Sequence, residues 1–261
     1  MTELAAPSEA TVEDLLQVIQ EHLQSPSAHE ELSETLGKLA AKAVEPDEKK
    51  AIAQYEGIAL LLQAMDKHLA VAGVQEKGCA ALKNLATDAD NECAIGKLNG
   101  ITAVIRSMGQ HSEMAGVQQQ ALGALWNLGF SEDHKIQIVE CGGLDALLRA
   151  MEQHVKVRAV QEQAFGVLRK ICESPDRGIT SIVAELGGVR AVQRALAEHP
   201  MSPFLVEHGC WLWWHFIWLS TWEEAVHINI MSHGGGDTAL KAMGKPFYKM
   251  PRPELQIHAA P

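Results

Sequence analysis

Apolar residues recur along this chain with the spacing of helices that bury one face. After Gly57 they stand one, four, five and eight residues later, at Ile58, Leu61, Leu62 and Met65. The spacing i, i+3, i+4, i+7 places four side chains on the same side of an α-helix. The same pattern follows two later glycines, so we expect several such helices.

This helical segment begins a unit that repeats through most of the chain. Similar segments start at four glycines, 43, 43 and 45 residues apart: Gly57, Gly100, Gly143 and Gly188. A related segment starts at Thr11, 46 residues before the first glycine, and an unfinished one starts at Gly235. Five units and a fragment thus cover about residues 11–243. Positions within a unit are counted from its first residue, the origin.

Two further helices are expected in each unit. Apolar residues stand at positions 17, 25 and 28, as in Val117, Leu125 and Leu128, and position 21 is small in the four units that begin with glycine. A short apolar segment precedes the next origin, marked by Ile95 and Ile138. Three helices in about 43 residues predict an all-α solenoid, in which each unit buries its apolar face against its neighbours.

Two of these units resemble armadillo repeats. The segments ALKNLA at 81–86 and ALWNLG at 124–129 match the end of that family's third and longest helix, and later units match less closely. The resemblance implies a right-handed α-solenoid of armadillo-type three-helix repeats. It divides the chain into an acidic N-terminal capping repeat, three regular repeats, a divergent Trp-rich repeat, and a truncated repeat with a proline-rich extended tail: 1–56, 57–99, 100–142, 143–187, 188–234 and 235–261.

The resemblance also implies a concave groove lined by the long third helices. In this family an asparagine at position 27 bonds the backbone of an extended partner peptide, since an amide offers both a donor and an acceptor. That position holds two asparagines among five residues: Lys38, Asn84, Asn127, Lys170 and His215. The tryptophans that form lysine pockets in nuclear-import adaptors are absent from position 23 of units two to four, so we do not expect that function.

We predict a groove that is open and shallow. Position 23 is small at Ala80, Gly123 and Gly166, and Lys77 and Lys170 add positive charge. The candidate groove residues are the following: Lys77, Asn84, Asn127, Lys170 and His215. The expected ligand is an extended or helical protein segment with some acidic residues. The alternative is that the two asparagines only bridge helices of adjacent units.

The segment CWLWWHFIWL at 210–219 is apolar on every helical face. It is too short to span a bilayer, so it must be buried against other protein. Trp211 and Trp214 are therefore candidates for partner contact, with an internal core as the alternative. The tail that follows is rich in proline.

Composition narrows the functional classes. The chain has 33 acidic and 22 basic residues, a net charge of −11 that argues against nucleic-acid or membrane-surface binding. No apolar run is long enough for a membrane span, and the N-terminus lacks the features of a signal peptide. Five scattered cysteines without a C-x-x-C pair indicate a reducing, cytoplasmic compartment.

Patterns that resemble catalytic or metal sites have simpler explanations. Histidine stands at position 11 of each unit, yet packed helices lie too far apart for a shared metal, so we expect these residues to cap helices: His22, His68, His111, His154 and His199. HGGG at 233–236 lacks the G-x-S-x-G partner of esterases. Cys79 and Cys210 are expected to be buried. We expect no enzyme activity, cofactor or metal.

Two hypotheses of function remain. The first is a non-enzymatic adaptor, a protein-interaction scaffold that binds partner segments in its groove. The second is a fixed structural subunit of a large assembly, held by its Trp-rich unit and its tail.

Overall fold

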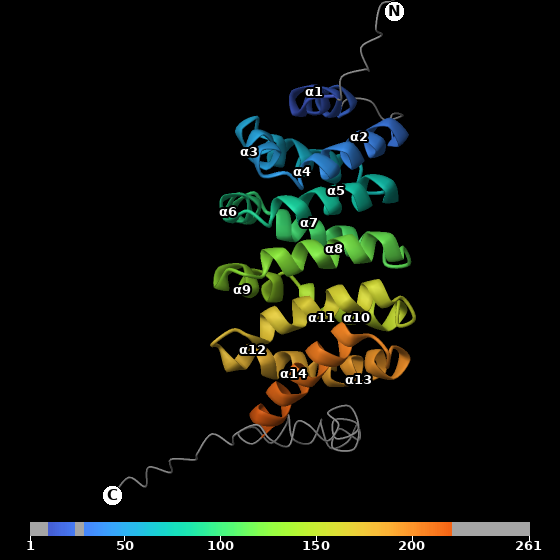
Figure 1. Cartoon of the computed structure of the whole chain (residues 1–261), viewed down its shortest axis with the longest axis vertical. Coiled ribbons are helices and arrows are strands. Elements are labelled where there is room, and N and C mark those ends of the chain that lie inside the picture. The colour runs from blue at the N-terminus through green and yellow to red at the C-terminus, as the bar shows by residue number, and fades with distance from the viewer. Residues whose placement is uncertain (1–9, 24–28, 221–261) are drawn as a thin grey trace, which may run out of the picture.

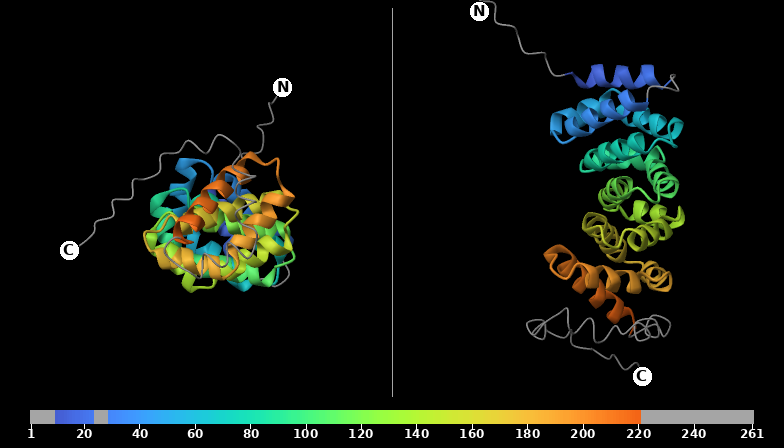
Figure 2. Two further views of the ribbon diagram at one scale, coloured as in Figure 1. Left: turned by 90° about the horizontal axis from the view of Figure 1, so that it is seen from below. Right: turned by 90° about the vertical axis from the view of Figure 1, so that its right-hand side faces the viewer.

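A computed structural model describes residues 10–23 and 29–220, and every regular element among them is an α-helix. The helices stack along one long axis from α1 to α14 (Figure 1), and a view from the side shows the same stack (Figure 2). The predicted all-α solenoid is confirmed.

Each unit begins with a helix of 11 residues, called here the origin helix: α1 (Val12–His22), α4 (Gly57–Lys67), α7 (Gly100–Gln110), α10 (Gly143–Gln153) and α13 (Gly188–Glu198). The long helices follow: α2 (His29–Lys42), α5 (Ala72–Leu85), α8 (Ala115–Leu128), α11 (Arg158–Cys172) and α14 (Pro203–Ser220). Four short connecting helices lead to the next origin: α3 (Pro46–Gln54), α6 (Ala89–Lys97), α9 (Glu132–Glu140) and α12 (Arg177–Glu185).

The long helices form one continuous layer, because each packs on the next, from α2 through α5, α8 and α11 to α14. The apolar positions of the repeat pattern form the core, and Leu61, Val104, Leu147 and Val192 are fully buried on successive origin helices. Each unit therefore buries its apolar face against its neighbours, as expected for a solenoid.

The origin glycine is required by a close approach of the backbone. A Cβ atom at Gly143 would lie 2.7 Å from the carbonyl oxygen of Ile138, and a Cβ at Gly188 would lie 2.7 Å from that of Val183. The residue just before each of the four origin glycines adopts a left-handed conformation, with φ of +77° at Gly142. This tight turn lets the connecting helix pass directly into the origin helix.

Buried glutamines at position 18 tie the origin helix to the long helix. In the third unit Gln118 Nε2 donates to the carbonyls of Met108 and His111, each at 2.9 Å. Gln75 and Gln161 make the equivalent two bonds in the second and fourth units. These bonds satisfy carbonyls at the end of the origin helix that have no partner within it.

Four of the five position-11 histidines bond a backbone carbonyl, and for three of them the expected partner was wrong. His111 Nε2 bonds the carbonyl of Leu69 at 2.7 Å, and His154 Nε2 bonds that of Ser112 at 2.6 Å. His199 repeats the bond one unit later. These three histidines therefore link successive units instead of capping their own helices. His22 does cap its own helix, through the carbonyl of Val18.

The long helix of the first unit begins later after its origin than the long helices of the other units. Its long helix α2 begins 18 residues after Thr11, whereas α5 begins 15 residues after Gly57. Counting from the origin therefore misplaces position 27 in this unit. Ala41, and not Lys38, aligns with Asn84, which corrects the prediction for Lys38.

Candidate partner-binding face

The exposed and half-buried side chains of α2, α5, α8, α11 and α14 form a surface called here the long-helix face. Its middle is not open, in contrast to the prediction from the small residues at position 23. A Cβ at Gly123 would lie 2.6 Å from Lys83 Cδ, and a Cβ at Gly166 would overlap the indole of Trp126. Side chains at position 26 of one unit thus cover position 23 of the next.

Between the fourth and fifth units, the same contact from position 26 to position 23 places a cation on an aromatic ring. Arg169, at position 26, lies over Trp211, at position 23, with 5.3 Å between its guanidinium carbon and the ring centroid. A cation above an indole face is attracted by the ring's electron density. A small residue at position 23 therefore leaves room for the position-26 side chain of the preceding unit. A tryptophan at position 23 stacks with that side chain instead.

The two asparagines bridge neighbouring long helices. Asn84 Nδ2 donates to the carbonyl of Ala40, and Asn127 Nδ2 donates to that of Lys83, both at 2.8 Å. The side-chain nitrogen of each asparagine is thus used as a donor within the fold, which favours the structural alternative for these positions. Peptide binding through their remaining oxygen atoms stays a prediction.

An open hollow of about 790 Å³ lies at the N-terminal end of this face, between α2 and α5. Its walls include Gly37, Gly73 and the predicted site residue Lys77. Lys77 Nζ lies 3.1 Å from the carboxylate of Glu76, and its stem packs against Gly37. Its charge is therefore already compensated within the protein.

The C-terminal part of the face carries uncompensated positive charge. Lys170 Nζ and Arg169 Nε share a single carboxylate, that of Glu173, at 2.9 and 3.1 Å. Lys170 also lies over the ring of Phe130, 4.2 Å from its centroid. Two cations facing one carboxylate leave one positive charge available to an acidic ligand.

A cluster of aromatic rings continues from this charge onto α14. Trp126 meets Phe204 edge-on at 5.8 Å, and Phe204 stacks on His208 at 3.9 Å. Further along the helix, Trp211 stacks on His215 at 3.7 Å. Together with Arg169, Lys170, Phe130 and Trp214, these rings are called here the aromatic–cation cluster.

The tryptophans of α14 divide between core and surface. Trp213 is fully buried, whereas 51% of Trp214 is exposed beside His215. Trp211 is half-buried within the cluster. In the part of the chain that the structure describes, no helix is both long and apolar enough to cross a membrane. Trp218's side chain, Trp222, the HGGG motif and the proline-rich tail lie outside what is described.

The structure thus brings together four of the seven predicted site residues: Lys170, Trp211, Trp214 and His215. Lys77 and Asn84 lie toward the other end of the face, with Asn127 between the two groups. The sequence prediction missed Trp126 and Arg169. Both residues stand at position 26. A long side chain at this position reaches the next unit, and this is the feature of the sequence that could have identified them.

Cysteine chemistry does not contribute to this face. All five cysteines are free, and Cys79 and Cys210 are buried as predicted. Burial raises the pKa of the Cys79 and Cys172 thiols to about 12, so both remain protonated near neutral pH.

The histidines of the cluster predict a loss of stability in mild acid. Burial is the main cause that lowers the pKa of His208 and His215 below 6.5, and Arg169 acts in the same direction. The unfolded chain then binds protons more readily just below pH 6.5, so the free energy of unfolding falls as the pH falls. His208→Phe keeps the stacking on Phe204 and should reduce the drop in melting temperature between about pH 7.5 and 5.5. An unchanged drop would contradict this assignment.

Comparisons with known proteins agree with the fold. No family model matches the chain. A stretch of 78 residues is 40% identical to the protein named aardvark of Dictyostelium discoideum, and it makes up 30% of this chain and only 10% of that protein. Crystal structures of two engineered proteins are similar, at 20% and 21% identity with TM-scores of 0.71 and 0.73. They cover 89% and 91% of this chain, which covers 90% and 55% of theirs. The chain shares their helical fold.

Proposed function

We propose that this chain is an armadillo-type protein-interaction scaffold that binds a partner segment on its long-helix face. The aromatic–cation cluster is the observation that carries this proposal. Tryptophan and arginine are the residues that most often dominate binding energy at protein interfaces. Here they lie together on α11 and α14, beside the half-exposed ring of Trp214.

The charge of the cluster supports an acidic partner segment. Glu173 compensates only one of the charges of Arg169 and Lys170. Lys83, further along the face, bonds the amide oxygen of Gln120 at 2.7 Å, and burial lowers its pKa. A carboxylate from the partner would compensate these cations, while an apolar neighbour packs on the rings.

The test compares variants in affinity purification and then with the purified partner. Arg169→Met with Lys170→Met removes both charges and keeps the apolar stems. Lys97→Met with Lys156→Met makes the same change in charge at exposed positions outside the cluster. We expect the first variant to weaken binding by about tenfold or more and the second to leave it unchanged. Equal binding by both variants would refute the proposal.

The second candidate is a fixed subunit of a larger assembly. The exposure of Trp214 at the C-terminal end of the described helices favours it. In this case Trp214→Ala should release a stoichiometric set of proteins, whereas Arg169→Met with Lys170→Met should retain them. The two candidates therefore give opposite results for the charge variant.

A further inference from the structure

Arginines form a regular row on the origin helices, on a different layer from the long-helix face. Position 6 is arginine in the last three units, at Arg106, Arg149 and Arg194. Arg106 Nη1 bonds Asp66 Oδ1 at 2.5 Å, and Arg194 Nη1 bonds Glu152 Oε1 at 2.7 Å. In both pairs the acid stands at position 9 of the preceding unit. The row is thus a ladder in which Arg106 and Arg194 each bind a carboxylate from the unit before.

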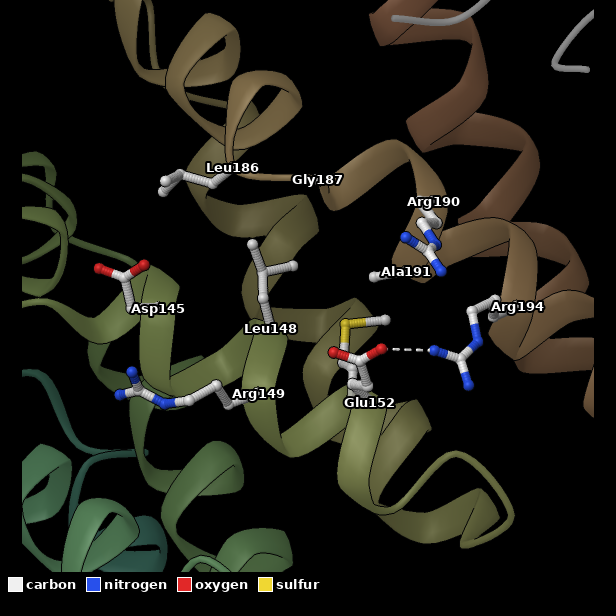
Figure 3. A pocket seen from close by; sticks show the side chains of 10 residues that line it. Asp145, Leu148, Arg149, Glu152, Leu186, Gly187, Arg190, Ala191 and Arg194 are labelled. Carbon is white, nitrogen blue, oxygen red and sulfur yellow. Dashed lines mark hydrogen bonds and ion pairs between the residues drawn. The ribbon is translucent and has the colours of Figure 1, made fainter. Parts of the chain in front are cut away.

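The middle rung of this ladder lacks its acid. Position 9 of the third unit is Gly109, and a Cβ built there would meet nothing within 4 Å. Arg149 makes no ion pair or hydrogen bond with the residues that the structure describes. In Figure 3 its guanidinium points away from the Glu152–Arg194 pair.

Hollows flank Arg149 on both sides of α10. One, of about 180 Å³, lies beside Gly109. The other, of about 260 Å³, lies between α10 and the turn before α13, and Leu148, Leu186 and Arg190 line it (Figure 3). Arg190 also lacks an ion pair with any described residue. The surface therefore combines two cations without such an ion pair, the carboxylate of Asp145 and an apolar floor.

We propose that the open rung at Arg149 binds a carboxylate side chain from an acidic segment of a partner protein. The incoming carboxylate takes the place above Gly109 that Asp66 and Glu152 occupy at the flanking rungs. A second acidic residue reaches Arg190, and an apolar residue packs on Leu148 and Leu186. The two filled rungs are the reason to choose a carboxylate, because the same arginine position binds one twice in this molecule. This site does not depend on the proposed function of the long-helix face.

The variant Gly109→Glu tests this proposal, because it restores the acidic residue that the flanking units carry at position 9. The new carboxylate would occupy the open rung from within the chain and exclude the ligand. Gly109→Gln has nearly the same size and fills the same space without charge, so it is the matched control. Arg149→Met removes the binding group itself. Asp145→Asn removes the acidic side chain one helical turn before Arg149 and should strengthen binding.

The probe is a fluorescein-labelled peptide, Glu-Glu-Leu-Leu-Glu-Glu, followed by fluorescence anisotropy at about 0.1 M salt. A single exposed pair is weak, so we expect a loss of about three- to fivefold for Gly109→Glu relative to Gly109→Gln, and a similar loss for Arg149→Met. The same peptide with glutamine in place of glutamate should not bind.

Three results would overturn the proposal. The first is equal affinity of Gly109→Glu and Gly109→Gln. The second is an affinity that falls with Arg169→Met and Lys170→Met but not with Arg149→Met, which would place the peptide on the long-helix face. The third is tighter binding of a labelled single-stranded DNA at the same arginine, which would make the ligand a phosphate.

Discussion

Gln118→Met should lower the free energy of unfolding by about 2–3 kcal/mol. The substitution keeps the volume of the buried side chain but removes both of its hydrogen bonds, to the carbonyls of Met108 and His111. The carbonyl of His111 keeps its bond from the backbone of Met114. The carbonyl of Met108 loses the side-chain donor that binds it. Leaving this buried carbonyl without a donor accounts for the larger part of the lost stability.

Urea denaturation followed by circular dichroism measures this effect. Gln119→Met is the control, since Gln119 is the half-buried neighbour on α8 and makes no such bond. We expect the control to change stability by less than about 0.5 kcal/mol. Equal destabilisation by the two variants would show that the tie between the helices contributes nothing.

Gly143→Ala should cost about 1–3 kcal/mol, because the new Cβ would lie 2.7 Å from the backbone oxygen of Ile138. A backbone atom cannot move aside as the end of a side chain can. The same change at Gly109 should stabilise the protein by about 0.5–1 kcal/mol, since the space there is open and glycine weakens a helix. Thermal unfolding measures both effects: we expect the melting temperature to fall for Gly143→Ala and to rise for Gly109→Ala. A shift in the same direction for both variants would contradict this prediction.

The periodic pattern of apolar residues was sufficient to predict the solenoid. Residues such as Leu61 and Leu147 recur where one helical face must be buried, and they lie in the core. The register of the first unit was wrong at Lys38, because apolar spacing fixes helices and not the length of the loop between them. The long helix of this unit begins three residues later after the origin than in the other units, and this shift leaves the periodicity of both helices intact.

The candidate site was predicted only in part, for a geometric reason. Sequence positions place a side chain on a helical face but do not show how far it reaches across the next unit. Gly166 therefore indicated an open groove, although Trp126 covers it. Trp211 and Lys170 were found because they occupy positions that the repeat pattern singles out, whereas Arg169 stands one residue before such a position.

The most direct test of the central claim is photo-crosslinking from the aromatic–cation cluster. A photoreactive phenylalanine analogue replaces Trp214 in one variant and Leu98, at the end of α6 and 45% exposed, in the other. We expect the purified partner to crosslink through position 214 and not through position 98, and Arg169→Met with Lys170→Met to abolish the crosslink. Crosslinking through position 98 alone would contradict binding on the long-helix face.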